Sequence, residues 1–169
     1  MKKGERRTSN IEHRTLNGSA NDLRVIHEAD AGGRKFDLEE RLLEFASAII
    51  DLSEKLPDTR AGNHVAGQIL RSGTSPFPNH GEAESAESRD DFIHKLKVCL
   101  KELRETRRWA RLIQRKAWSK DETTLLFVLG ESDELIRIFM SSVKTAQQNA
   151  LVQKQKRSAS ASYPRGEAG

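Results

Sequence analysis

The chain has 169 residues, of which 5% are aromatic and 32% charged, and its formal net charge is +4. This length suits one domain, the few aromatic and proline residues favour long helices over a β-sandwich or doubly wound sheet, and the single cysteine, Cys99, excludes a disulfide framework or a thiolate zinc site. Without a run of eighteen apolar residues, or an apolar stretch among the first thirty, we expect no membrane span or signal peptide and a cytoplasmic location.

The positive charge is concentrated at the two ends of the chain. Residues 1–35 hold eight basic and five acidic groups and are predicted to be a disordered basic tail. Residues 36–154 hold 18 basic and 19 acidic groups and carry helical patterns throughout, whereas residues 155–169 are rich in Ser and Ala and are predicted to be a second disordered tail. Nucleic-acid binding by a nearly neutral body would therefore require local clustering of basic residues.

The first predicted helix covers residues 38–56. Apolar residues recur there at steps of three and four, from Leu38 to Leu56. Asp37 and Glu40 form a capping pair at its start, and Pro57 lies just beyond its end.

The second predicted helix is less regular, because Pro76 and Pro78 must kink or interrupt it. If its turns continue through the prolines, four polar residues share an arc of about 80°. They are Arg71, Ser75, Asn79 and Glu82. This stripe is either a ligand-binding groove or a structural polar network, satisfied and buried, in which Arg71 and Glu82 pair with neighbouring helices, and we favour the network.

The third predicted helix starts after the capping residue Ser88 and runs to about Lys116. One face, about 100° wide, is apolar and predicted to be buried, and it includes Cys99 as a small hydrophobic group. A second face, about 80° wide, is a basic ridge. The ridge residues are Lys97, Lys101, Arg104, Arg108, Arg111 and Arg115. Either the ridge is a solvated helix face, or it contacts phosphates without reading sequence, since no aromatic groups interleave it.

Apolar residues also lie between these two faces of the third helix. Val98, Trp109 and Leu112 are placed where the internal core does not need them. An exposed tryptophan with apolar neighbours suggests a contact between subunits.

A fourth helix is predicted to start at a capping box formed by Ser119 and Glu122. Its apolar residues continue at steps of three and four to Val143. Four amphipathic helices joined by short connections predict an all-α fold, an antiparallel up-down-up-down four-helix bundle.

Catalytic and metal-binding patterns are weak. The histidines within the predicted bundle are His64, His80 and His94, and none belongs to an HExxH or Glu-x-x-His motif. The sequence contains no nucleophile elbow and no glycine-rich phosphate loop. We therefore expect no enzymatic activity, no cofactor and no metal.

Three strings of the sequence resemble a known bacterial family. FDLEERLLEFASAIIDLSEKLP, RSGTSPFPNHGEAESAES and DFIHKLKVCLKELRETRRWARLI resemble the four-helix-bundle family named after the 23S rRNA intervening-sequence protein, over about residues 36–146. That family is similar to the accessory variability determinant of diversity-generating retroelements. The resemblance implies a homopentameric ring without known enzymatic activity, possible nucleic-acid binding, and, for the retroelement member, a reverse transcriptase as partner. Glu102, Glu105 and Trp109 match the family pattern and are therefore candidates for subunit contacts, in agreement with the apolar residues Val98 and Leu112 that the helical spacing places beside them.

Together these patterns predict a homo-oligomer, a pentamer by the resemblance, that binds RNA or DNA backbone through the ridge. The alternative is a protein-interaction scaffold or accessory subunit, in which the ridge meets an acidic protein partner and nucleic-acid binding is incidental. Membrane association is not expected.

Overall fold

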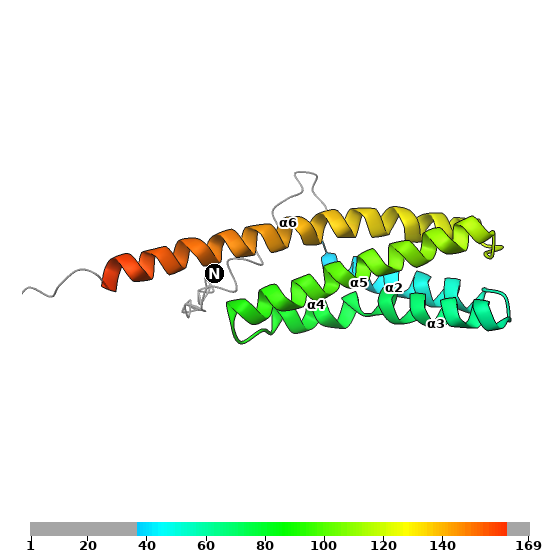
Figure 1. The fold of residues 1–169 in the computed structure, drawn as a ribbon, viewed down its shortest axis with the longest axis horizontal. Coiled ribbons are helices and arrows are strands. Elements are labelled where there is room, and N and C mark those ends of the chain that lie inside the picture. Colours follow the sequence, from blue (N-terminus) through cyan, green and yellow to red (C-terminus); the bar gives the residue numbers. More distant parts are fainter. Residues whose placement is uncertain (1–36, 162–169) are drawn as a thin grey trace, which may run out of the picture.

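The computed structural model describes residues 37–161, and these fold into helices without a strand. The helices are α2 (Leu38–Glu54), α3 (Arg60–Thr74), α4 (Pro76–Glu84), α5 (Arg89–Lys116) and α6 (Glu122–Ala161). α3 and α4 follow one another and together form one arm of the fold. This arm, α2, α5 and α6 are the four arms of an antiparallel bundle (Figure 1). The predicted all-α fold and four-helix bundle are confirmed.

The first arm begins where the sequence predicts and ends two residues before the predicted end. Asp37 accepts a hydrogen bond from the backbone N–H of Glu40, with 3.1 Å between Oδ1 and N. This bond satisfies one of the free N–H groups at the start of α2. The helix stops at Glu54, shortly before Pro57.

The second arm is interrupted where the sequence predicts. α3 ends at Thr74 and α4 begins at Pro76, whose missing N–H costs nothing at a first helical position. Gly73 has a role that the sequence did not reveal. A Cβ on Gly73 would lie 2.6 Å from Cγ1 of Ile49, so this glycine lets α3 approach α2 closely.

α5 is the central helix of the candidate site. Ser88 Oγ accepts from the N–H of Asp91 at 3.1 Å, as the predicted cap requires. At the other end Ala117 adopts a left-handed conformation with φ 50°, and the N–H of Trp118 bonds to the carbonyl of Ile113 at 3.2 Å. The chain therefore turns back against α5 and brings Trp118 to the side of the bundle.

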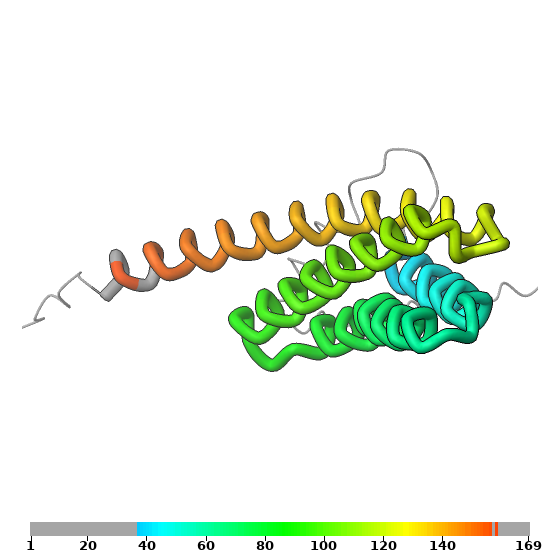
Figure 2. Tube along the Cα trace, turned by 45° about the vertical axis from the view of Figure 1, so that its right-hand side comes forward, coloured from blue at the N-terminus to red at the C-terminus, as the bar shows by residue number. Residues whose placement is uncertain are grey.

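Two predictions for α6 need correction. Asp121, not Ser119, caps the helix, because its Oδ1 accepts from the N–H of Thr124 at 3.0 Å while Ser119 bonds to the backbone of Asp121. The helix also continues to Ala161, whereas the sequence placed the end of the bundle at residue 154. Its 40 residues extend roughly 60 Å, past the other helices (Figure 2). The predicted tail over residues 1–35 and the end of the second tail, residues 162–169, lie outside the described residues.

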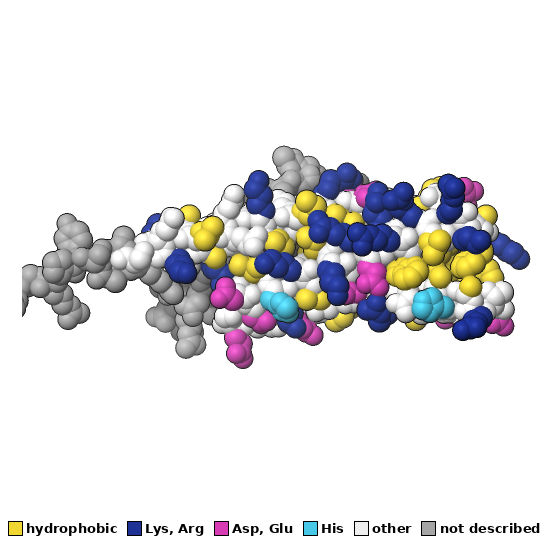
Figure 3. All heavy atoms as spheres, viewed as in Figure 1, with side chains coloured by type: hydrophobic (Ala, Val, Ile, Leu, Met, Phe, Trp, Pro, Cys, Tyr) yellow, Lys and Arg dark blue, Asp and Glu magenta, His cyan; other side chains and the backbone are white. Residues whose placement is uncertain are grey.

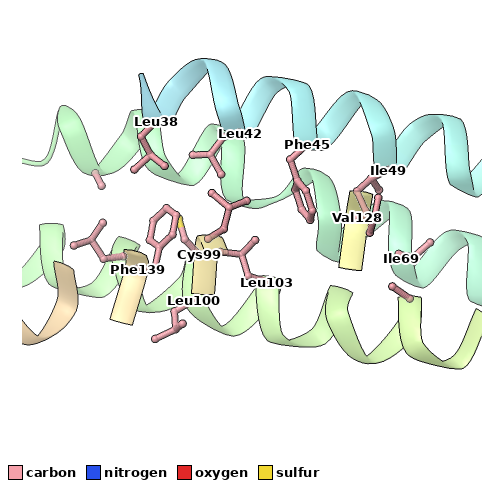
Figure 4. Packing of buried hydrophobic residues seen from close by; sticks show 14 of the residues in the cluster. Leu38, Leu42, Phe45, Ile49, Ile69, Cys99, Leu100, Leu103, Val128 and Phe139 are labelled. Carbon is pink, nitrogen blue, oxygen red and sulfur yellow. The ribbon is translucent and has the colours of Figure 1, made fainter. Parts of the chain in front are cut away.

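The core lies between all four arms (Figure 4). Phe45 of α2, Phe92 of α5 and Phe139 of α6 are at most 1% exposed and pack with aliphatic side chains. Cys99 is fully buried, as predicted, and burial raises the pKa of its thiol to about 12. Thr106 of α5 donates a hydrogen bond to Ser72 of α3 over 3.0 Å, so the buried hydroxyls are satisfied.

Within the described residues, no helix combines the length and the apolar character that crossing a bilayer requires. The same part of the chain contains no cluster of three or more His, Cys, Asp or Glu side chains that could hold a metal ion.

Candidate nucleic-acid interface

The basic ridge lies on the outer side of α5. All six of its side chains are exposed, and they follow one another at steps of three and four residues: Lys97, Lys101, Arg104, Arg108, Arg111 and Arg115. From first to last they span roughly 27 Å at 1.5 Å per residue. Lysine and arginine side chains are crowded along one face of the molecule, where the bundle presents α5 and α6 (Figure 3).

The ridge has few acidic partners within residues 37–161. Lys101 lies 3.7 Å from Oε1 of Glu102, but no described carboxylate forms an ion pair with the other five ridge residues. Other cations of α5 are paired. Lys95 forms an ion pair with Glu82 of α4, and Nη2 of Arg107 bonds to Oδ2 of Asp133 of α6 at 3.2 Å. Most of the α5 cations that lack an ion pair with a described carboxylate therefore lie on the outward face.

This arrangement has an energetic cost. Like charges three or four residues apart on a helix destabilise it by about 0.2–0.5 kcal/mol per pair, and each ridge residue has such a neighbour. Only Arg115 gains from the helix dipole, since it lies in the last turn of α5. A surface that keeps this repulsion is suited to an anionic ligand, which would remove it.

α6 extends the basic surface in a way that the sequence alone did not predict. Lys154 lines the same groove as Lys97, a hollow of about 680 Å³ between α6 and the start of α5. The sequence could not show which helix Lys154 faces, because that depends on the antiparallel register of α5 and α6.

The predicted polar stripe does not form one buried network. Arg71 Nη2 lies 2.6 Å from Glu105 and its Nη1 lies 3.7 Å from Glu102, both on α5. Glu82 pairs with Lys95. The remaining two residues bond to each other, Asn79 Nδ2 to Ser75 Oγ at 3.1 Å. Arg71 and Glu82 therefore reach the neighbouring helix as predicted, but both side chains are more than half exposed.

The five predicted subunit-contact residues of α5 lie in different surroundings: Val98, Glu102, Glu105, Trp109 and Leu112. The Glu102 side chain is 8% exposed and faces Arg71, so it is buried within a single chain, and its Oε2 lacks a hydrogen bond from any described residue. Trp109 is half-buried, not exposed, because it packs edge-on against His64 of α3 with 6.2 Å between ring centroids. Leu112, at 38%, is the most exposed apolar member.

The structure also has an aromatic cleft beside the ridge, which the sequence did not predict. It has a volume of about 590 Å³ and is lined by residues from the start of α3, from the last turns of α5 and from the loop after α5: Arg60, Ala61, His64, Val65, Trp109, Leu112 and Trp118. The residues come from segments more than 40 positions apart, so periodicity could not bring them together. Figure 3 shows apolar side chains gathered near a histidine, next to basic side chains.

A family model, described as 23S rRNA-intervening sequence protein, matches residues 34–141 of this chain. The chain belongs to the 23S rRNA-intervening sequence protein family. The match covers α2 to α5 and the first half of α6, and so includes the whole ridge and cleft. The resemblance found in the sequence is confirmed.

A solved structure supports the same membership. The chain is similar to a protein of unknown function from the S23 ribosomal protein family of Bacteroides thetaiotaomicron, with 38% identity and a TM-score of 0.57. The similarity covers 63% of this chain and 94% of that protein. No curated protein matches the chain.

Proposed function

We propose that this member of the 23S rRNA-intervening sequence protein family is a non-enzymatic, homo-oligomeric bundle that binds the RNA or DNA backbone through the ridge of α5. The observation that carries the proposal is the row of exposed cations, five of which have no ion pair with a described residue. Phosphates spaced along a nucleic acid would supply the missing negative charges. RNA is the first ligand to test, because the family is named after 23S rRNA.

The proposal is one of local recognition, not of bulk attraction. Residues 36–154 carry 18 basic and 19 acidic groups, so the bundle as a whole would not attract a polyanion. Arginines, which supply four of the six ridge residues, are permanently charged and form bidentate contacts with phosphate. They supply no proton acceptor near neutral pH, which favours binding over catalysis.

Self-association would strengthen such a weak, sequence-tolerant site. Repetition of the ridge around a pentamer raises the effective affinity for a long nucleic acid without any new contact. Exposed apolar side chains on other arms are candidates for the subunit contacts: Leu43 and Ile50 of α2, each 43% exposed, and Leu70 of α3, 39% exposed. The partly buried Trp109 and the buried Glu102 are less available for that purpose.

The test is fluorescence anisotropy with labelled RNA and DNA across a salt series. Arg104→Gln together with Arg108→Gln removes two ridge charges, and Lys120→Gln together with Lys156→Gln removes two exposed charges outside α5. Each phosphate contact contributes about a factor of eight at 0.1 M salt, so the ridge variant is expected to bind duplex roughly 60-fold more weakly. Its log–log salt slope should fall in magnitude by about 1.8.

The control variant separates the ridge from net charge. If both variants weaken binding equally, bulk charge carries the interaction and the proposal fails. If the wild type, with its oligomeric state checked by light scattering, binds no nucleic acid at low salt, the proposal also fails.

The second candidate is a scaffold or accessory subunit for a protein partner such as a reverse transcriptase. The far end of α6 favours it, because Leu151 and Val152 are 62% and 48% exposed there. Val152→Gln, which lies outside the hollow that Lys97 and Lys154 line, is expected to weaken capture of such a partner and to leave nucleic-acid affinity unchanged. An acidic partner protein would also displace labelled RNA from the ridge.

A further inference from the structure

We infer that the aromatic cleft between α3 and α5 takes an unpaired nucleobase of the nucleic acid whose backbone lies on the ridge, so that the protein prefers single-stranded over duplex ligand. This inference rests on the proposed function, since it assigns the base to a backbone that the ridge holds.

The cleft and the ridge are continuous. A second hollow, of about 430 Å³, lies on α5 and is lined by Lys101, Glu105, Arg108, Trp109 and Leu112. Trp109 and Leu112 line both hollows, and Lys101 and Arg108 belong to the ridge. A phosphate held by the ridge would therefore lie within one nucleotide's reach of the cleft.

The charge around the cleft suits this occupant. Lys101 and Arg108 lie on one side and Arg60 on the other. Glu105 is the acidic group of the second hollow, but its Oε1 lies 2.6 Å from Arg71, so its charge is already compensated. An anionic chain can therefore approach from the ridge without meeting an unpaired carboxylate in these hollows.

The aromatic side chains are held in place before any ligand arrives. The ring of Trp109 meets that of His64 edge-on, with an interplanar angle of 80°, and its Nε1 lies 3.4 Å from Glu105. Lys116 lies 5.8 Å from the ring centre of Trp118. The left-handed turn at Ala117, a strained conformation for a residue with a Cβ, brings Trp118 to the cleft. Fixed aromatic groups beside cations are the usual elements of a stacking site for unpaired bases.

Size and chemistry distinguish a base from a phosphate. About 590 Å³ falls within the usual range of ligand pockets, and apolar and aromatic side chains dominate the lining. A base inside a duplex is already stacked on its neighbours and cannot enter the cleft without being flipped out, which costs a few kcal/mol. A flexible single strand avoids that cost.

The experiment compares a 12-nucleotide oligothymidylate with a blunt 12-base-pair DNA duplex. Trp109→Leu is expected to weaken single-strand binding by about 5- to 150-fold, the loss that one base–aromatic stack gives, while duplex affinity stays unchanged. Arg104→Gln with Arg108→Gln should weaken both ligands. Equal affinity of wild type and Trp109→Leu for the single strand would overturn the inference and leave the ridge intact as a binding site.

Intrinsic fluorescence provides a second measurement, which uses the wild type and does not depend on whether a Trp109 variant folds. The protein has two tryptophans, Trp109 and Trp118, and both line the cleft. The oligothymidylate should quench their fluorescence in the wild type at saturation, whereas the duplex should not. Quenching by both ligands or by neither would overturn the inference. A change in oligomeric state on Trp109→Leu would also overturn it, because a second copy of the chain would then cover the cleft. Failure of the wild type to bind either ligand would instead defeat the proposed function.

Discussion

The cations around α5 belong to two classes that differ in what they contact. Lys95 and Arg107 point to neighbouring helices and pair with Glu82 and Asp133. Arg108 and its ridge neighbours point to solvent, and most form no ion pair with a described carboxylate. Charge on one helix can therefore serve two purposes. Paired cations fix the register of the bundle, and unpaired ones reduce stability slightly and remain free for a ligand.

The largest effect on stability is expected at Arg71, a paired cation of α3 that contacts Glu102 and Glu105 of α5. Arg71→Met keeps part of the side chain's packing but leaves the buried carboxylate of Glu102 without its arginine. Such a loss costs about 1–3 kcal/mol of unfolding free energy, which urea denaturation would measure.

Arg137→Met is the matched control for that change. Arg137 pairs with Glu134, but both side chains are more than half exposed, so about 0.5 kcal/mol or less should be lost. Adding Glu102→Gln to Arg71→Met should recover much of the stability, as a double-mutant cycle would reveal. Equal costs for the two arginines would remove the distinction between buried and exposed partners.

A smaller effect of opposite sign is expected on the ridge. Arg104→Gln with Arg108→Gln removes four like-charge neighbour pairs, with Lys101, Arg107 and Arg111 and between the two arginines themselves, and one opposite-charge pair with Glu105, a net relief of three pairs. Stability should rise by about 0.6–1.5 kcal/mol at low ionic strength, and the gain should shrink as salt is added. Thermal unfolding at two salt concentrations would measure it. A destabilised ridge variant would mean that these arginines are structural after all.

The smallest effect concerns an exposed pair, Lys55 and Asp121. The hydrogen bond from Lys55, 2.7 Å long, and those from Thr124 hold the pKa of the Asp121 carboxyl well below its usual range. A carboxyl whose pKa is lowered in the folded state stabilises the fold at any pH above its unfolded-state pKa, near 4. This stabilisation is lost as the pH falls toward the folded-state pKa. The melting temperature of the wild type should therefore fall more between pH 5 and pH 2 than that of Asp121→Asn, in which asparagine still caps α6.

Lys55→Met provides the reciprocal check, because it removes the other partner of the same pair. The pKa of Lys55 is raised by Asp121, so its share of the stabilisation is present below about pH 10.5 and lost above it. Unchanged acid sensitivity in both variants would show that this exposed pair contributes nothing, as many surface pairs do.

Particular residues show how far the sequence could predict this structure. Apolar residues that recur every three or four positions predicted the places of α2 and α5, and Asp37 and Ser88 cap these helices as predicted. The cap of α6 was misplaced, because Ser119 and Asp121 are both good capping residues and only the direction of the turn after Ala117 selects between them. The length of α6 was underestimated, since its last turns lack an apolar stripe to reveal them.

The candidate site divides in the same way. The sequence placed the ridge on one side of α5, because positions on a single helix follow from 100° per residue. The sequence could not predict that His64 contacts Trp109 or that Lys97 and Lys154 line one groove, because the residues of each pair lie on different helices.

By itself, the sequence determined the helices, the buried stripe of α5 and the outward basic ridge, all of which follow from local periodicity and capping. Only the tertiary structure decided which charges are paired and that two tryptophans and a histidine form one cleft. Contacts between helices depend on the register of the helices and on the distance between them, as at Gly73, where the absence of a Cβ leaves room for the side chain of Ile49. Those quantities are set by packing of the whole core and leave no periodic signal in any one helix.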